Sequence, residues 1–311
     1  MMKRISALVL LELLVACTVV SPLSDELKVS SGVPLEPARL VAFTTSEGFE
    51  LAYRAYVPKA KPTAALVFYH GGVYGGADYQ TLGHRLQQMG VATYMPDILG
   101  DGHGESEGGD APEPERVLRN AKAFVAFVRT QHPDTAIAVG GHSSGVGLML
   151  NVLDTMPKPL PLDGIVMIAP DFGHPADSKN EPNPTPVVDP DFRSFPSDGV
   201  SDDWFEDEPA VGFNYPDIVR GGDPKLFEGK ASAMWKTVTP EEPRKALADI
   251  DVPIGIWLGE GDVEFDTAKV VQFVLDANPN AKLTVVEGVG DLTSMAETGQ
   301  TVGNWLTALK P

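Results

Sequence analysis

The pentapeptide Gly141-His142-Ser143-Ser144-Gly145 decides the fold. It fits the pattern Gly-x-Ser-x-Gly, in which a serine stands at a sharp turn between a strand and a helix. An apolar run over 136–139 precedes it, and apolar residues at helical spacing follow it over 146–153. Small flanking residues suit this turn because the backbone crowds around a strained serine. The five-residue pattern alone is a weak signal, but its setting makes Ser143 a candidate nucleophile.

Short β-rich runs alternate with helical patterns from about residue 39 to the C-terminus. Such alternation predicts an α/β fold with a mostly parallel sheet and helices on both faces. We expect eight strands, at 40–45, 51–57, 64–69, 91–96, 136–139, 164–169, 254–258 and 283–287. We expect helices at 79–89, from about 114 to 128, at 146–153 and 267–275, and around 302–309.

The alternation fails between about residues 171 and 239, a stretch rich in Pro, Gly, Asp and aromatic residues. A structureless loop of that length is improbable inside a compact domain. We therefore predict an inserted cap within one domain that spans 39–311. Open α/β sheets place their ligand sites at the carboxyl ends of the strands, so we expect the cap to cover that edge.

The N-terminus is typical of a bacterial export signal. Residues 1–4 are basic, and residues 5–16 are mostly apolar and too short to span a bilayer. The run 14–17 resembles a lipobox, although Glu12 departs from the usual pattern. We predict a lipoprotein-type signal over 1–16, a lipid on Cys17, a tether over 17–38 and a location in the cell envelope. The alternative is a plain secretion signal, which would leave the protein secreted or periplasmic.

Composition narrows the class of partner. The formal charge is −19, from 24 Lys and Arg against 43 Asp and Glu, and no basic patch is visible. Nucleic-acid binding requires cations against phosphate, so we exclude it. The chain carries no phosphate-binding loop, dinucleotide fingerprint or zinc-type cluster, so we expect no cofactor and no metal. A membrane is an expected partner if Cys17 is lipidated.

Three further motifs accompany the pentapeptide. His70-Gly71-Gly72 follows the predicted strand 64–69. The segment 97–106, Asp-Ile-Leu-Gly-Asp-Gly-His-Gly-Glu-Ser, follows the strand 91–96. Gly259-Glu260-Gly261-Asp262 follows the strand 254–258.

In this order the motifs resemble the monoacylglycerol lipase-like and lysophospholipase-like α/β hydrolases, related to the serine aminopeptidase S33 type. The likeness runs from about residue 40 to the C-terminus, with two extra residues between Asp97 and Gly102. It implies the α/β-hydrolase fold, a movable cap and hydrolysis of carboxylic esters, so the expected partner is a small-molecule ester or lipid. It also implies that Asp262 is the triad acid and that the N–H groups of Gly72 and Ser144 bind the oxyanion. The neighbouring carboxylates are expected to be solvated loop charges, namely Glu260, Glu264 and Asp266.

The resemblance also places the triad histidine at position 291, just after the last strand, but this chain has Asp291. A carboxyl group ordinarily has a lower pKa than imidazole, so a carboxylate accepts a proton less readily. Three interpretations remain open. The chain is an inactivated or engineered esterase; another histidine such as His174 is the base; or Asp291 is a weak base, unless the alignment of this loop is shifted.

Three functions follow from these residues. The first is an ester hydrolase with Ser143, Asp262 and Asp291 in the catalytic positions. The second is a non-catalytic binding protein of the same fold that has kept the pocket without the base. The third is a peptidase, because related families share this serine turn and the fold alone does not separate them.

Overall fold

The computed structural model describes a defined part of the chain. The described residues are 17–20, 37–48, 50–71, 79–98, 113–155, 162–172, 187–190, 209–213, 229–231, 236–262, 266–286 and 295–311. Among them, no helix is both long enough and apolar enough to cross a membrane.

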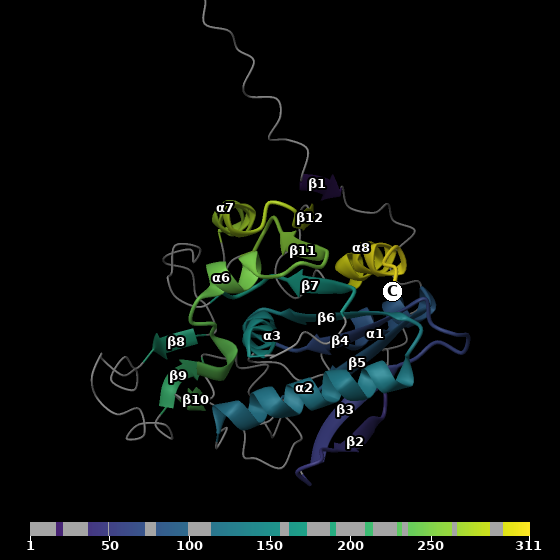
Figure 1. Ribbon diagram of the computed structural model, residues 1–311. Helices are drawn as coiled ribbons and strands as arrows, with labels where there is room; N and C mark the ends of the chain where they lie inside the picture. Colours follow the sequence, from purple (N-terminus) through teal and green to yellow (C-terminus); the bar gives the residue numbers. More distant parts are fainter. Residues whose placement is uncertain are drawn as a thin grey trace, which may run out of the picture.

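One large sheet organises the described part of the chain. Its order is β1-β12-β11-β7-β6-β4-β5-β3-β2, and Figure 1 shows it from top to bottom. Eight of its nine strands point the same way, and β3 points the opposite way. The ladders of β3 with β2 and β5 are antiparallel, and all other ladders of this sheet are parallel. The strands are β1 (Cys17–Val20), β2 (Leu40–Thr44), β3 (Glu50–Tyr56), β4 (Ala64–Tyr69), β5 (Val91–Pro96), β6 (Ala136–His142), β7 (Gly164–Ile168), β11 (Ile254–Gly259) and β12 (Lys282–Val286).

Helices cover both faces of this sheet (Figure 1). One face carries α1 (Gln80–Gln88) and α8 (Met295–Thr307). The other carries α2 (Pro114–Gln131), α3 (Ser144–Asp154), α6 (Pro243–Ala248) and α7 (Thr267–Ala277). The predicted fold class is therefore confirmed. The eight predicted strands are present, and β1 extends the sheet beyond β12 as a ninth.

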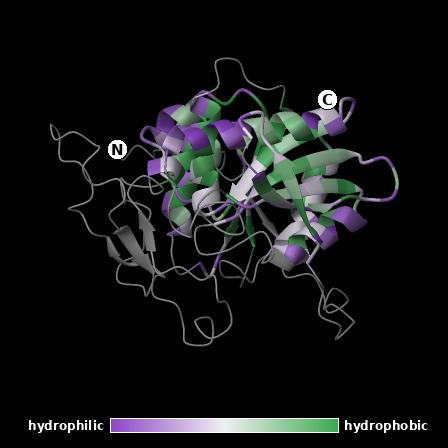
Figure 2. Cartoon of the chain, turned by 90° about the horizontal axis from the view of Figure 1, so that it is seen from below, coloured by the Kyte–Doolittle hydropathy of each residue, from purple (hydrophilic) through white to green (hydrophobic). Residues whose placement is uncertain are grey.

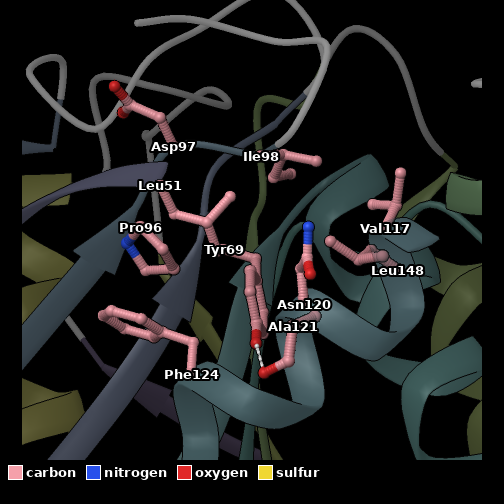
Figure 3. A pocket seen from close by; sticks show the side chains of 10 residues that line it. All are labelled: Leu51, Tyr69, Pro96, Asp97, Ile98, Val117, Asn120, Ala121, Phe124 and Leu148. Carbon is pink, nitrogen blue, oxygen red and sulfur yellow. Dashed lines mark hydrogen bonds between the residues drawn. The ribbon is translucent and has the colours of Figure 1, made fainter. Parts of the chain in front are cut away.

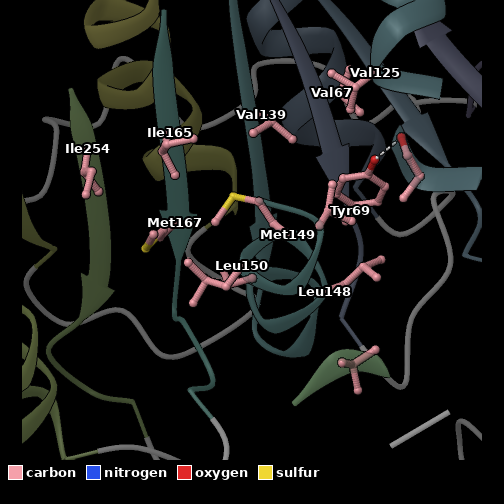
Figure 4. Close-up of a cluster of buried hydrophobic side chains, with 14 of the residues drawn as sticks. Val67, Tyr69, Val125, Val139, Leu148, Met149, Leu150, Ile165, Met167 and Ile254 are labelled. Atoms are coloured by element: carbon pink, nitrogen blue, oxygen red, sulfur yellow. Dashed lines mark hydrogen bonds between the residues drawn. The ribbon is translucent and has the colours of Figure 1, made fainter. Parts of the chain in front are cut away.

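The central strands are buried on both faces, as parallel strands between helix layers must be. Every residue of β4, β5, β6, β7 and β11 is buried. One apolar cluster joins the sheet to α2, α3 and α7, and Figure 4 shows the part around Met149, Leu150 and Ile165. A second cluster joins the opposite face to α1 and α8. Hydrophobic residues accordingly gather inside and hydrophilic ones on the outer helix surfaces (Figure 2).

The predicted cap region contains a small sheet of its own. Its strands are β8 (Val187–Pro190), β9 (Pro209–Phe213) and β10 (Gly229–Ala231), paired antiparallel in the order β10-β9-β8. Backbone groups of these three strands bond to one another, so this stretch contains regular structure although its sequence shows no periodicity. That it covers the candidate site stays a prediction.

The returning end of this insertion is fastened to α3. The side-chain amide of Asn151 faces three backbone carbonyls, those of Thr237 at 2.7 Å, Lys236 at 3.3 Å and Thr239 at 3.4 Å. One turn earlier on the same helix face, a Cβ at Gly147 would lie 1.8 Å from the carbonyl oxygen of Val238. The segment 236–239 therefore lies directly against the backbone of α3.

The N-terminal strand β1 lies beside β12, with Cys17 opposite Leu283. Residues 17–20 thus pair with the sheet, whereas the sequence suggested that the tether begins at Cys17. The lipid on Cys17 and the cell-envelope location stay predictions.

We predict that Asn151→Ala lowers the free energy of unfolding by about 1–3 kcal/mol, because partly buried carbonyls lose their donor. Urea denaturation measures this. The matched control is Asn304→Ala on the exposed face of α8, where the lost bond to Gln300 is solvated and costs about 0.5 kcal/mol or less. Equal losses for the two variants would show that Asn151 does not fasten the insertion.

Candidate active site

Ser143 lies at the turn between β6 and α3, as the sequence predicted. Its backbone has φ 50° and ψ −124°, and apart from Ala169 no other described residue that is not glycine has a positive φ. Such a conformation costs an L-residue about 1–3 kcal/mol. The turn lifts Ser143 out of the buried strand, so it is partly exposed while both of its neighbours are buried.

Hydrogen bonds from the next strand hold this strained turn. The Ser143 N–H donates to the carbonyl of Ile168 at 3.0 Å, and its own carbonyl accepts from the N–H of Asp171 at 3.2 Å and of Val146 at 3.0 Å. Ala169, with φ 40°, lies between Ile168 and Asp171 in the sequence, and its N–H donates to the carbonyl of Trp257 at 2.9 Å. The segment that leaves β7 is therefore bound to the backbone of the serine on both sides.

The two flanking glycines are required by close backbone packing. A Cβ at Gly141 would lie 2.5 Å from the carbonyl carbon of Gly145. A Cβ at Gly145 would lie 2.4 Å and 2.5 Å from the carbonyl oxygens of Tyr69 and His70. Only glycine fits either place without moving the backbone, which explains the Gly-x-Ser-x-Gly pattern.

Of the two predicted oxyanion donors, Ser144 lies within the described residues. Ser144 begins α3, where backbone N–H groups have no partner within the helix and the helix dipole favours negative charge. Gly71 lies against the nucleophile, since a Cβ there would be 3.4 Å from the Ser143 Cβ. Gly72, the other predicted donor, falls outside the described residues.

Hydrogen bonds assign one tautomer to His70 and explain its structural role. The N–H of Ile98 donates to its Nε2 at 3.0 Å, so that nitrogen carries the lone pair. The proton is then on Nδ1, which donates to the carbonyl of Gly71 at 2.9 Å. His70 is 1% exposed, and it links the glycine loop, which begins with Gly71 after β4, to Ile98 after β5.

Tyr79 makes a contact that no sequence pattern signals. Its hydroxyl accepts a hydrogen bond from the Gly71 N–H at 2.9 Å and lies 2.8 Å from Nδ1 of His142. A tyrosine beside a helical pattern is normally interpreted as a packing residue, and only the fold places it under the glycine loop.

Asp262 follows β11 and is 8% exposed. Because β6, β7 and β11 are parallel neighbours, Ser143 and Asp262 lie at the same sheet edge with one strand between them. Two strand spacings are about 10 Å, which leaves room for a bridging imidazole. Of the other carboxylates near Asp262, Asp266 caps α7 by accepting from the Lys269 N–H at 3.2 Å, and Glu264 falls outside the described residues.

The base is the third catalytic position that the sequence analysis considers, after Ser143 and Asp262. β12 ends at Val286, next to β11 at the same edge of the sheet. Asp291 comes five residues later and lies outside the described residues, and His103 and His174 also lie outside them. His84 packs edge-on against Tyr56, and Nε2 of His132 lies 2.8 Å from the Tyr94 hydroxyl, where burial lowers its pKa. His142, adjacent to the serine, reaches Tyr79 instead.

Two hollows in the described residues are too small or too remote to hold a substrate against Ser143. A cavity of about 20 Å³ lies below the carboxyl ends of β4 and β5, and Figure 3 shows Tyr69, Asp97 and Asn120 around it. It has room for about one water molecule. A groove of about 460 Å³ is lined by Asn151, Asp154 and Thr155, at the end of α3 opposite Ser143. Within the described ranges, no cluster of three or more His, Cys, Asp or Glu could hold a metal ion.

Comparison with known proteins agrees with this geometry. Residues 60–192 match the family model described as serine aminopeptidase, S33. Monoglyceride lipase of Mus musculus is 26% identical over 125 residues, and that of Rattus norvegicus 23% identical over 125 residues. Each match covers 40% of this chain and 41% of the relative, so the chain spans about two-fifths of the curated relatives that it matches.

Solved structures share the fold over most of the chain. A soluble variant of monoglyceride lipase from Saccharomyces cerevisiae, in complex with a substrate analog, superposes with a TM-score of 0.65 at 14% identity, covering 88% of this chain and 96% of that one. A putative aryl esterase from Burkholderia cenocepacia gives 0.60 at 15% identity, covering 86% and 97%.

The sheet order and the strained serine between β6 and α3, with Asp262 after β11, give this chain the α/β-hydrolase fold. Within that fold, its sequence is similar to the serine aminopeptidase S33 family model over residues 60–192 and to two monoglyceride lipases over 125 residues.

The strain at Ser143 is open to a direct test. Glycine adopts positive φ without the Cβ penalty, so Ser143→Gly is expected to be about 1 kcal/mol more stable than Ser143→Ala in urea denaturation. Ala126→Gly in the middle of α2 is the control, where the same exchange destabilises by about 1 kcal/mol. If Ser143→Ala were the more stable of the pair, the turn would not be strained.

Proposed function

We propose that the protein hydrolyses carboxylic esters through an acyl-enzyme on Ser143. The observation that carries this proposal is the strained, glycine-packed turn that presents Ser143 between the first residue of α3 and Gly71. A folded chain retains such strain where the conformation has a use, and here the use is to expose one hydroxyl beside backbone donors.

The reaction has two balanced steps. Ser143 Oγ attacks the ester carbonyl, its proton passes to the base, and the carbonyl oxygen becomes an oxyanion that the N–H groups of Ser144 and Gly72 bind. The C–O bond to the alcohol then breaks and the alcohol leaves with that proton. Water next attacks the acyl-serine, which releases the carboxylic acid and regenerates Ser143. Asp262 orients the base and stabilises its charged form.

A neutral ester of small or lipid type is the substrate that we propose. The curated relatives are named for monoglycerides and a structural neighbour for aryl esters. The charge of −19, with Asp171 and Asp262 at the edge where Ser143 lies, disfavours anionic substrates through repulsion.

Asp291 limits this activity if it occupies the place of the base. A carboxylate accepts the Ser143 proton poorly near neutral pH, so we predict that Asp291→His raises kcat by two or more orders of magnitude. Hydrolysis of p-nitrophenyl acetate and butyrate by both proteins measures the change.

Ser143→Ala in the Asp291→His background is the control and should remove the gain. Equal rates for the unmodified and Asp291→His proteins, both abolished by Ser143→Ala, would show that position 291 is not the place of the base. His174→Ala would then test the other candidate.

A binding protein without catalysis is the second candidate, and the observation in its favour is the aspartate at position 291. Labelling by a fluorophosphonate separates the two functions, because the reagent requires an activated serine. A hydrolase is expected to react on Ser143 within minutes, while Ser143→Ala remains unlabelled. A protein that binds neutral esters but is not labelled on Ser143 would be the binder.

A further inference from the structure

We propose that Tyr79 is a positioning residue for the oxyanion hole, which acts by holding Gly71 against the nucleophile. This inference rests on the proposed ester hydrolysis. Tyr79 is fully buried beside α1, at the helix end nearest to the glycine loop after β4.

The hydroxyl of Tyr79 links two elements of the site. It accepts from the Gly71 N–H at 2.9 Å and keeps one hydrogen, with which it can donate to Nδ1 of His142 at 2.8 Å. His142 is the last residue of β6 and is covalently joined to Ser143. One hydroxyl therefore connects the glycine loop to the strand that carries the nucleophile.

Gly71 is held at its carbonyl as well as at its N–H. Nδ1 of His70 donates to the Gly71 carbonyl oxygen at 2.9 Å, and Nε2 of His70 is fixed in turn by the Ile98 N–H. The backbone of Gly71 is therefore held at both of its polar groups, by Tyr79 at the N–H and by His70 at the carbonyl. Tyr79 and His70 thus fix the residue that precedes the predicted donor Gly72 in the sequence.

The hydrogen bonds from Tyr79 and His70 form a clamp on Gly71, and the surroundings of Gly71 leave it little freedom to move. A Cβ at Gly71 would lie 2.9 Å from Nδ1 of His142, 3.3 Å from the Tyr79 hydroxyl and 3.4 Å from the Ser143 Cβ. Gly71 is therefore enclosed by the groups that hold it and by the nucleophile. An oxyanion donor stabilises the transition state only when its position is set beforehand, and this enclosure fixes the residue next to the predicted donor in the sequence.

The test is Tyr79→Phe, which removes one oxygen and keeps the ring. We expect kcat for p-nitrophenyl butyrate to fall about 10- to 100-fold, somewhat less than for loss of a donor outright, with KM changed less than about threefold. The same variant should slow fluorophosphonate labelling of Ser143 by a similar factor, because the phosphonyl oxygen also uses the oxyanion donors.

The matched control is Tyr56→Phe. Tyr56 is 1% exposed, and its hydroxyl accepts from the backbone N–H of Ala38 at 3.2 Å, far along the sheet from Ser143. This variant should lose as much thermal stability as Tyr79→Phe while kcat stays within twofold of the unmodified protein. Unchanged kcat in Tyr79→Phe, or an equal fall in both variants, would overturn the proposal.

Amide hydrogen exchange separates the clamp from the proposed function. The Gly71 amide should be protected in the unmodified protein, and its exchange should accelerate at least tenfold in Tyr79→Phe but not in Tyr56→Phe. If the unmodified and Asp291→His proteins neither hydrolyse esters nor react with fluorophosphonate, ester hydrolysis fails while this pattern still supports the clamp. An unprotected Gly71 amide in the unmodified protein overturns the clamp, whether or not Tyr79→Phe folds.

Discussion

The backbone conformation of Ser143 is the constraint on which the described structure depends. A serine with φ 50° is unfavourable, and it persists because its surroundings determine it completely. β7 supplies the acceptor for its N–H, the chain leaving β7 supplies a donor for its carbonyl, and Gly141 and Gly145 admit the backbones that pack around it. The same parallel strands bring Asp262 to the edge where Ser143 lies. The positions of Ser143 and Asp262 at one edge of the sheet therefore follow from a single arrangement of β6, β7 and β11.

Much of this arrangement was predictable from sequence because the deciding signals are local. β4 and β5 have the predicted bounds, since each is a mostly apolar run, and β4 is followed by His70-Gly71 while β5 ends at Pro96. The turn at Ser143 was predictable because its packing leaves no room for a Cβ at Gly141 or Gly145, which are the two glycines of the local pattern. β6, however, continues to His142, three residues beyond the predicted end. The ladder that pairs Gly140 and Gly141 with β7 outweighs the low strand propensity of glycine.

Other features depend on contacts between distant segments and could not be predicted. α6 is six residues long, too short for a periodic signal. The fastening of residues 236–239 to α3 depends on Asn151, which is polar on a helix and carries no local sign of its carbonyl partners. Tyr79 meets Gly71 and His142 only after β4, α1 and β6 have packed together. Asp291 was visible at once as a departure from the family pattern, because the expected residue type there has a specific chemical task.

We propose that the fold holds the Ser143 nucleophile ready and that the base governs the rate. The most direct measurement of this claim is mass spectrometry of the protein after brief reaction with p-nitrophenyl butyrate and an acid quench. We predict one added butyryl group on the peptide that contains Ser143, in the unmodified protein or in Asp291→His. The absence of an acyl group on Ser143 in both proteins, or ester hydrolysis that survives Ser143→Ala, would contradict the account.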